Sequence, residues 1–252
     1  MTFSTPSVIA LLLILISAVV LVYLTRQYRS RPSVGLRSVE AYQALQRQAA
    51  RAVESGRGIH FSLGRGSLGK ATNPASLAAM SALQNLSKEA GASGKPPLVT
   101  SGDGTLFVAS QDLIRGSYEE LGRPGAYQSQ TSRFVAPEDS PMTYGAAVSE
   151  IINTGEHGSN IVLGHIGSEL AIIAEAADRE HLEQIIGSDD ITALAVAMSV
   201  TEDVIIGEEL FAAAAYLQGE PAHIASLQLQ DILRILVALI ILIAALVSLL
   251  TG

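Results

Sequence analysis

A short apolar run leads into three closely spaced glycines in the stretch Ile59-His-Phe-Ser-Leu-Gly-Arg-Gly-Ser-Leu-Gly-Lys70. Gly64, Gly66 and Gly69 satisfy G-x-G-x-x-G, which in a dinucleotide site forms a tight turn and lets the backbone approach a pyrophosphate. The stretch also nearly satisfies the P-loop pattern G-x-x-x-x-G-K, but Ala71 stands where a Ser or Thr would hold magnesium. The sequence here predicts a strand and a glycine-rich turn, with two incomplete phosphate-binding motifs.

Outward from this stretch, strand-like and helix-like segments alternate along the chain. Strands are predicted at 59–63, 97–101, 131–136, 160–165 and 183–187, and helices at 38–54, 75–90, 105–121, 141–153, 168–180 and 190–199. Ser168 is the expected N-cap of its helix. Beyond residue 199 only helices are predicted, over 204–217 and from 222 onward. Strict alternation through five strands predicts an α/β fold with a doubly wound, mostly parallel five-stranded sheet, Rossmann-like or flavodoxin-like.

Two apolar segments near the ends of the chain are long enough to cross a bilayer. Residues 8–24 and 232–250 are apolar with few interruptions, and a membrane helix needs about 20 such residues, with about 17 as the lower limit. Arg26, Arg29 and Arg31 follow the first segment, which favours an uncleaved anchor with these arginines on the cytoplasmic side. The expected localisation is the cell inner (cytoplasmic) membrane, with two spans, a cytoplasmic soluble domain and both termini outside.

These features predict four parts of the chain. They are a first transmembrane helix (1–25), a basic juxtamembrane segment and helix (26–58), a cytoplasmic α/β domain (59–221), and a connecting segment with the second transmembrane helix (222–252). The formal net charge is -8, with basic residues gathered in 26–70 and acids in 138–231. The basic part suits anionic lipid heads, and the acidic part argues against nucleic acid as a partner. The expected partners are the lipid bilayer and either further copies of the chain or other membrane proteins.

In an open parallel sheet, ligands bind beyond the carboxyl ends of the strands. The loops that meet there contain the candidate ligand-binding residues Gly64, Gly66, Gly69, Lys70, Asp103, His165 and Asp189. Lys70 would supply a positive charge to a phosphate, and Asp103 would reach a ribose hydroxyl. Asp103 lies 34 residues beyond Gly69, however, whereas a dinucleotide site has its acid about 20 residues on. No cofactor is therefore predicted, and a nucleotide is retained as the alternative to a glycine-rich turn that packs helix against sheet.

Other motifs carry little chemistry. The five histidines form no H-x-x-x-H or H-E-x-x-H spacing, the chain has no cysteine, and no G-x-S-x-G occurs, so neither a metal site nor a catalytic residue is predicted. His157 is expected in a solvated turn. Glu208 and Glu209 fall within the predicted 204–217 helix, and the alanines at 212–215 provide a smooth face for the core or for a subunit contact.

Three further stretches carry a family resemblance. Gln111-Asp-Leu-Ile-Arg115, Ile206-Gly-Glu-Glu-Leu-Phe-Ala-Ala-Ala-Ala-Tyr-Leu217 and Pro221-Ala-His-Ile-Ala-Ser-Leu-Gln-Leu-Gln-Asp231, with the glycine stretch, resemble an uncharacterised family of bacterial two-span membrane proteins with a domain of unknown function. The resemblance covers most of the chain, supports the two spans, and implies no activity or site residues.

Two functional hypotheses follow from these observations. The leading one is a membrane-anchored cytoplasmic interaction or scaffold module, without enzymatic activity, in a homo-oligomer or a larger membrane complex. The alternative is a sensor or enzyme that binds a nucleotide-like phosphate ligand at the glycine loop. A transporter is disfavoured, because two spans without a buried acid cannot line a pathway unless many copies assemble.

Overall fold

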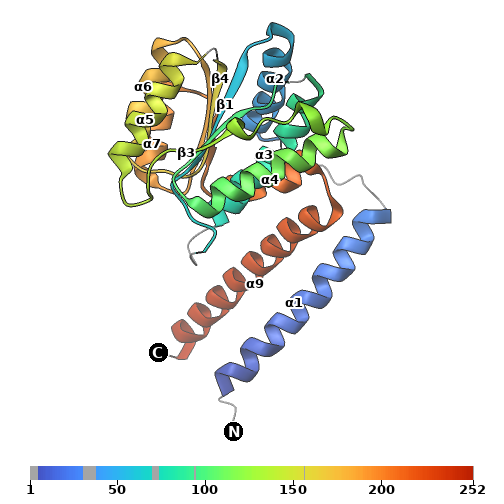
Figure 1. Ribbon diagram of the computed structural model, residues 1–252. Helices are drawn as coiled ribbons and strands as arrows, with labels where there is room; N and C mark the ends of the chain where they lie inside the picture. The colour runs from blue at the N-terminus through green and yellow to red at the C-terminus, as the bar shows by residue number, and fades with distance from the viewer. Residues whose placement is uncertain (1–4, 31–37, 70–73, 94, 156, 252) are drawn as a thin grey trace. The chain divides into compact units, whose positions relative to one another are not determined.

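The computed structural model describes residues 5–30, 38–69, 74–93, 95–155 and 157–251. Two compact units make up the chain. Ser38–Leu217 forms the α/β domain, and Met1–Arg37 together with Gln218–Gly252 contains two long apolar helices (Figure 1). Lys70, the predicted phosphate contact, lies outside the described residues.

A parallel sheet of six strands forms the centre of the α/β domain (Figure 1). The strands are β1 (Gly58–Gly64), β2 (Leu98–Ser101), β3 (Ser132–Phe134), β4 (His157–His165), β5 (Glu183–Ser188) and β6 (Val204–Ile206). Their order is β3-β2-β1-β4-β5-β6, and every neighbouring pair is parallel. This is the strand order of Rossmann-type sheets, so the predicted doubly wound α/β class is confirmed.

Helices cover both faces of the sheet, because each crossover returns the chain to a parallel strand. One face packs against α2 (Glu40–Ser55), α3 (Pro74–Ser93), α4 (Gly104–Glu120) and α8 (Ala213–Gln218), and the other against α5 (Pro141–Thr154), α6 (Leu170–Arg179) and α7 (Ile191–Val200). Short 3-10 helices occupy Pro124–Ala126 (η1), Ser129–Thr131 (η2) and Gly207–Ala212 (η3). Phe61 and Leu63 of β1 are fully buried on the first face, and Val162 of β4 on the second. Burial on both faces explains the near-continuous apolar runs of the central strands.

The prediction of five strands is wrong, because the segment expected as one helix over 204–217 divides into three elements. Val204–Ile206 pairs with β5 as the edge strand β6, η3 follows, and only Ala213–Gln218 is α-helical. The three β-branched residues of β6 favour a strand, but so short an apolar run does not distinguish a strand from a buried helix. Ala213 and Ala215 are buried in the domain core, so this alanine face belongs to the core.

Two local predictions are also wrong. β4 begins at His157, three residues before the predicted start, and the His157 side chain is buried instead of lying in a solvated turn. α6 begins at Leu170 with Glu169 at the N-cap position, so Ser168 does not cap it. The Glu169 carboxylate makes other contacts, described below.

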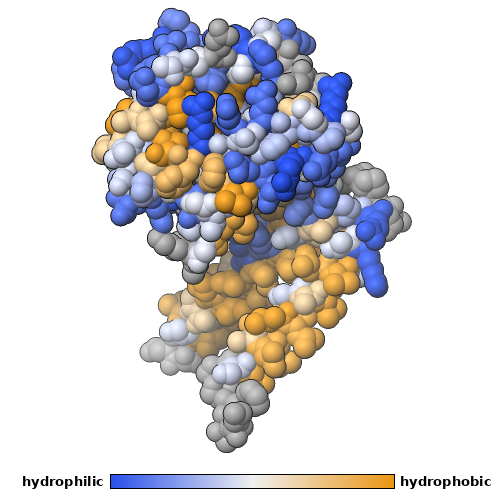
Figure 2. Space-filling view, viewed as in Figure 1, coloured by the Kyte–Doolittle hydropathy of each residue, from blue (hydrophilic) through white to orange (hydrophobic). Residues whose placement is uncertain are grey.

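α1 (Thr5–Ser30) and α9 (Pro221–Thr251) are long and apolar enough to cross a membrane. Their apolar segments, Ala10–Arg29 and Pro221–Leu249, have mean hydropathies of 2.1 and 3.0. Leu24 and Tyr28 of α1 pack against Ala225 of α9. Figure 2 shows the visible side of both helices as largely hydrophobic, as expected for side chains that face lipid.

Candidate functional site

The carboxyl ends of β1 and β4 form the topological switch point of the sheet. β1 is followed by α3 on one face and β4 by α6 on the other, although the two strands are neighbours. In open α/β sheets the crevice that opens between such diverging connections is where ligands bind. The predicted residues Gly64 and His165 lie here and are register partners.

Two glycines allow the strand ends to approach closely. Gly64 has a φ of 70°, and a Cβ on it would lie 2.3 Å from the carbonyl oxygen of His165. Gly164 has a φ of 133°, and a Cβ there would lie 2.3 Å from the carbonyl oxygen of Leu63. The Arg65 amide donates to the His165 carbonyl at 2.7 Å. Gly64 is therefore needed for strand packing at this point, whether or not a ligand binds.

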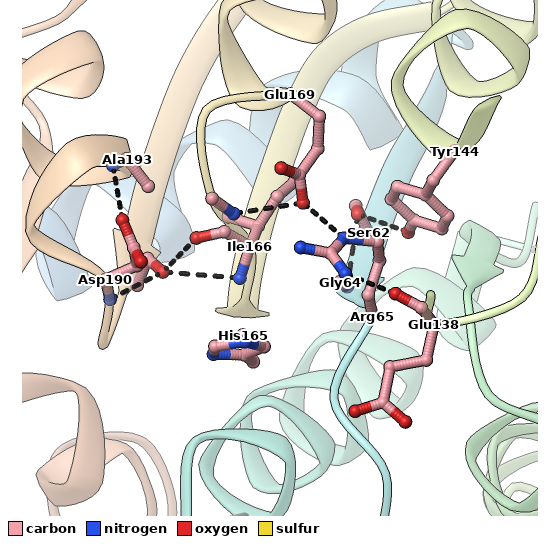
Figure 3. A network of polar contacts seen from close by, with 12 residues as sticks. Ser62, Gly64, Arg65, Glu138, Tyr144, His165, Ile166, Glu169, Asp190 and Ala193 are labelled. Atoms are coloured by element: carbon pink, nitrogen blue, oxygen red, sulfur yellow. Dashed lines mark hydrogen bonds and ion pairs between the residues drawn. The ribbon is translucent and has the colours of Figure 1, made fainter. Parts of the chain in front are cut away.

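Arg65 lies between Glu169 and Glu138 in a network of polar contacts at the switch point, and sequence reasoning did not select it (Figure 3). Its Nε donates to Glu169 Oε1 at 2.5 Å, and its Nη1 donates to the Glu138 carbonyl oxygen. Glu169 is 1% exposed and also accepts from the Gly167 amide at 3.0 Å. The guanidinium charge is thus neutralised within the domain by a buried carboxylate, which removes it as a free phosphate contact.

His165 and Asp189 form a hydrogen-bonded pair at the switch point. His165 Nδ1 lies 2.8 Å from Asp189 Oδ1, and the side chains are 39% and 26% exposed. This hydrogen bond raises the pKa of His165 above its ordinary value, against the lowering effect of partial burial. Because the bond uses Nδ1, the other ring nitrogen of this half-exposed histidine is the atom placed to contact a ligand.

Two other acids at these strand ends cap helices. Asp103, after β2, accepts from the amides of Thr105 and Leu106 as the N-cap of α4. Partial burial raises the pKa of Asp103, but hydrogen bonds from Thr105, Leu106 and Ser67 lower it overall. Asp190 caps α7 in the same way. The bond from Ser67 brings the glycine loop to Asp103, yet the carboxylate predicted to reach a ribose is already occupied.

A buried polar layer supports the crevice from within the sheet. Ser62 Oγ lies 2.8 Å from Tyr144 Oη and accepts from the Gly64 amide at 3.3 Å. His60 contacts Asn160 Oδ1 at 2.7 Å and Thr100 Oγ1 at 3.0 Å. Complete burial raises the pKa of Tyr144 to about 12 and lowers that of His60 to about 4.

Both groups are therefore neutral near pH 7. They hold β1, β2 and β4 in place under the crevice through hydrogen bonds alone, since neither carries charge. Polar residues at alternate positions of β1 were the available sequence signal for this layer.

The glycine loop differs from a dinucleotide site in where its helix begins. α3 starts at Pro74, five residues after Gly69, so the described part of the G-x-G-x-x-G loop does not open a helix. In the dinucleotide fingerprint, the helix N-terminus carries the pyrophosphate. Gly66 is buried and Gly69 is exposed. Residues 64–69 thus lie at the switch point without themselves forming a helix N-terminus.

Two cavities of about 340 and 350 Å³ are lined by described residues, and both open at the amino-terminal edge of the sheet. The residues His157 and Thr131 line one, and Glu183 and Asp203 the other. Within the described part of the chain, no group of three or more His, Asp or Glu side chains is arranged to hold a metal ion.

Comparisons with known proteins bear on the whole chain. The family model described as "Domain of unknown function (DUF6754)" matches residues 1–252. Neither the search of curated proteins nor the search of solved structures found a match. The family match extends over both apolar helices and the α/β domain, so the resemblance to a domain of unknown function is confirmed for the full length. The chain belongs to the DUF6754 family.

Proposed function

We propose that this protein is a membrane-anchored interaction module. α1 and α9 cross the cytoplasmic membrane, and the α/β domain on the cytoplasmic side presents the carboxyl edge of its sheet to another membrane protein or to a second copy of the chain. The spans are supported by the length and hydropathy of both helices. The orientation is supported by Arg26 and Arg29 at the end of α1.

Exposed apolar side chains along one edge of the α/β domain carry the proposal. They follow the carboxyl ends of the strands, at the starts of helices or the last strand positions: Leu77, Val108, Phe134, Met142, Ile191 and Ile206. Ile191 is 85% exposed and Leu77 is 61% exposed. Single exposed apolar residues are ordinary, but their recurrence around one edge is typical of an interaction surface. The acids at this edge, such as Glu138 and Asp189, favour a protein partner over anionic lipid.

Cysteine chemistry tests this surface, since the natural chain has no cysteine. Ile191→Cys and Met198→Cys place a single thiol at opposite ends of α7, and both native side chains are exposed. Each variant, in native membranes, is labelled with a maleimide photo-crosslinker. Ile191→Cys should give a discrete adduct, at about twice 26.4 kDa for a second copy or at another defined mass for a different membrane protein. If both positions give the same products, or neither gives any, the carboxyl edge is not the interaction surface.

Accessibility of a thiol tests the orientation. A membrane-impermeant maleimide should label Arg123→Cys only after the cytoplasmic side is opened, because the whole α/β domain is expected there. Labelling in intact cells would reverse the proposed orientation.

One observation favours a second function, ligand binding at the switch point. His165 is half-exposed at the point where the strand order reverses, with Nδ1 fixed by Asp189. A thermal-shift screen of the full chain with nucleotides tests it, because a ligand that binds the folded form raises its apparent stability. The shift should shrink in His165→Ala. A shift that is the same in that variant excludes His165 as the contact.

A further inference from the structure

The cavity of about 340 Å³ at the amino-terminal edge of the sheet differs in charge from the rest of the domain. Its basic lining residues are Lys95, which precedes β2, Arg133 of β3, and His157 at the start of β4. Gln128 and Gln130 add polar side chains, and none of the described lining residues is acidic. In a chain with a formal charge of -8, a cavity of this size whose described lining residues include no carboxylate is a candidate anion site.

The second cavity at the same edge provides a comparison. It has a volume of about 350 Å³ and contains two arginines, but also Asp178, Glu183 and Asp203. Arg51 there forms an ion pair with Glu183. Its cations are thus balanced by neighbouring acids, which is the usual arrangement on a solvated surface.

The end of helix α2 accounts for the position of Lys95 beside this cavity, but no helix end accounts for Arg133. Lys95 Nζ donates to the carbonyl oxygen of Gly56, just after α2, as cations commonly do at a helix carboxyl terminus. Arg133 lies on a strand, and among the described residues its side chain has no hydrogen-bond or ion-pair partner. No described residue therefore occupies the guanidinium of Arg133, which lines the cavity.

His157 supplies a second, independent observation. Its side chain is 7% exposed, and it lines the cavity. The Ile151 carbonyl lies nearby, but neither ring nitrogen forms a hydrogen bond of acceptable geometry with a described residue. Burial lowers the pKa of His157, and the nearby positive charges of Arg133 and Arg57 lower it further, against the raising effect of the Ile151 carbonyl. A buried polar group without a partner costs stability unless water or a ligand satisfies it.

We infer that this cavity binds a small anion that carries a phosphate group, either free in solution or as a lipid headgroup. The Arg133 guanidinium presents several donors in a planar arrangement that matches phosphate oxygens. His157 would donate from the buried wall, and the Gln128 and Gln130 amides can donate at the rim. The site is separate from the carboxyl edge described above, so it stands or falls independently of the proposed interaction surface.

Thermal unfolding of the full chain in nanodiscs of neutral phosphatidylcholine tests the inference, with inorganic pyrophosphate titrated at constant ionic strength. Arg133→Gln removes the exposed cation, Arg133→Lys keeps the charge without the planar donors, and Arg51→Gln is the matched control in the other cavity. Pyrophosphate should raise the Tm saturably in the natural protein and in Arg51→Gln. Arg133→Gln should weaken the apparent Kd by about 10-fold or more, and Arg133→Lys by less.

Nanodiscs that contain phosphatidic acid distinguish the source of the phosphate. If phosphatidic acid raises the Tm without added pyrophosphate, if this increase depends on Arg133, and if pyrophosphate competes with phosphatidic acid for binding, the site is assigned to a lipid headgroup. Arg133-dependent stabilisation by pyrophosphate in neutral nanodiscs alone assigns it to a soluble anion. The inference is overturned if the Tm rises saturably in neither lipid. Equal losses in Arg133→Gln and Arg51→Gln would also overturn it, because they would indicate general ionic screening.

Discussion

Replacing one partner of the Arg65–Glu169 pair should strongly destabilise the α/β domain. The two side chains are 13% and 1% exposed, and Nε and Oε1 are 2.5 Å apart. Removing one partner of a buried pair leaves an uncompensated charge and costs about 3–5 kcal/mol, whereas an exposed pair contributes about 0–1 kcal/mol. Glu169→Gln preserves the shape of the side chain and an acceptor for the Gly167 amide, so the loss reports mainly the ionic contact.

The magnitude can be measured in the full chain by pulse proteolysis in urea, which detects the unfolded fraction of the α/β domain. The same loss can be expressed as a thermal shift. For a domain of about 180 residues, 1 kcal/mol shifts the Tm by about 2–4 °C, so Glu169→Gln should lower the Tm of the α/β domain on the order of 6–20 °C in a thermal melt. Arg65→Met should cost a similar amount, because it leaves Glu169 buried without its cation.

A second pair and a double variant provide controls. Arg51→Gln breaks the exposed pair with Glu183 and should change the unfolding free energy by less than about 1 kcal/mol. The double variant Arg65→Met with Glu169→Leu removes both charges and should be less destabilised than the sum of the single variants. If Glu169→Gln costs no more than Arg51→Gln, the pair does not stabilise the crevice and the reasoning fails.

Three further changes test other parts of the fold. Gly64→Ala should lower the unfolding free energy by about 2–5 kcal/mol in the same assay, because a φ of 70° and the 2.3 Å approach to the carbonyl oxygen of His165 both oppose a Cβ. The control Gly56→Ala, at a φ of 65° but with open space around the Cβ, should lower it by about 1 kcal/mol. Ala213→Glu should unfold the domain, by about 3 kcal/mol or more, because Ala213 is fully buried, while the half-buried Ala214→Glu should cost much less; equal effects would place Ala213 outside the core. His165→Gln should reduce the unfolding free energy most below pH 6.5, the ordinary pKa of histidine, and progressively less as the pH rises through the raised pKa of His165 in the folded state. The reason is that the hydrogen bond to Asp189 stabilises the protonated ring. A pH-independent difference from the natural protein would contradict this.

Local sequence chemistry was sufficient for most elements of the fold. The β-α alternation predicted a doubly wound parallel sheet. The apolar run and the glycines that follow it placed the end of the first strand at Leu63, one residue before the observed end of β1 at Gly64. Composition alone identified α1 and α9, since a run of about 20 apolar residues has few alternatives to a spanning or buried helix. These features depend on neighbouring residues in the chain, and that is why a single sequence contains them.

The sixth strand depended on a distant partner. Val204–Ile206 is three residues long, and its conformation is set by hydrogen bonds to β5 at the sheet edge. The burial of His157 likewise follows from pairing with β1. Neither contact leaves a periodic signal in so short a segment, so sequence patterns favoured a helix in one case and a turn in the other.

The character of the switch point was decided by tertiary structure. The sequence by itself determined that glycines, a histidine and acids would meet at the carboxyl ends of the strands, since parallel strands bring their loops to one edge. It did not determine that Glu169, 104 residues away in the chain, would neutralise Arg65, or that Asp103 would cap α4. Such pairings depend on side-chain directions fixed only after the sheet and both helical layers pack, which is why a motif that predicts phosphate binding can instead stabilise the fold.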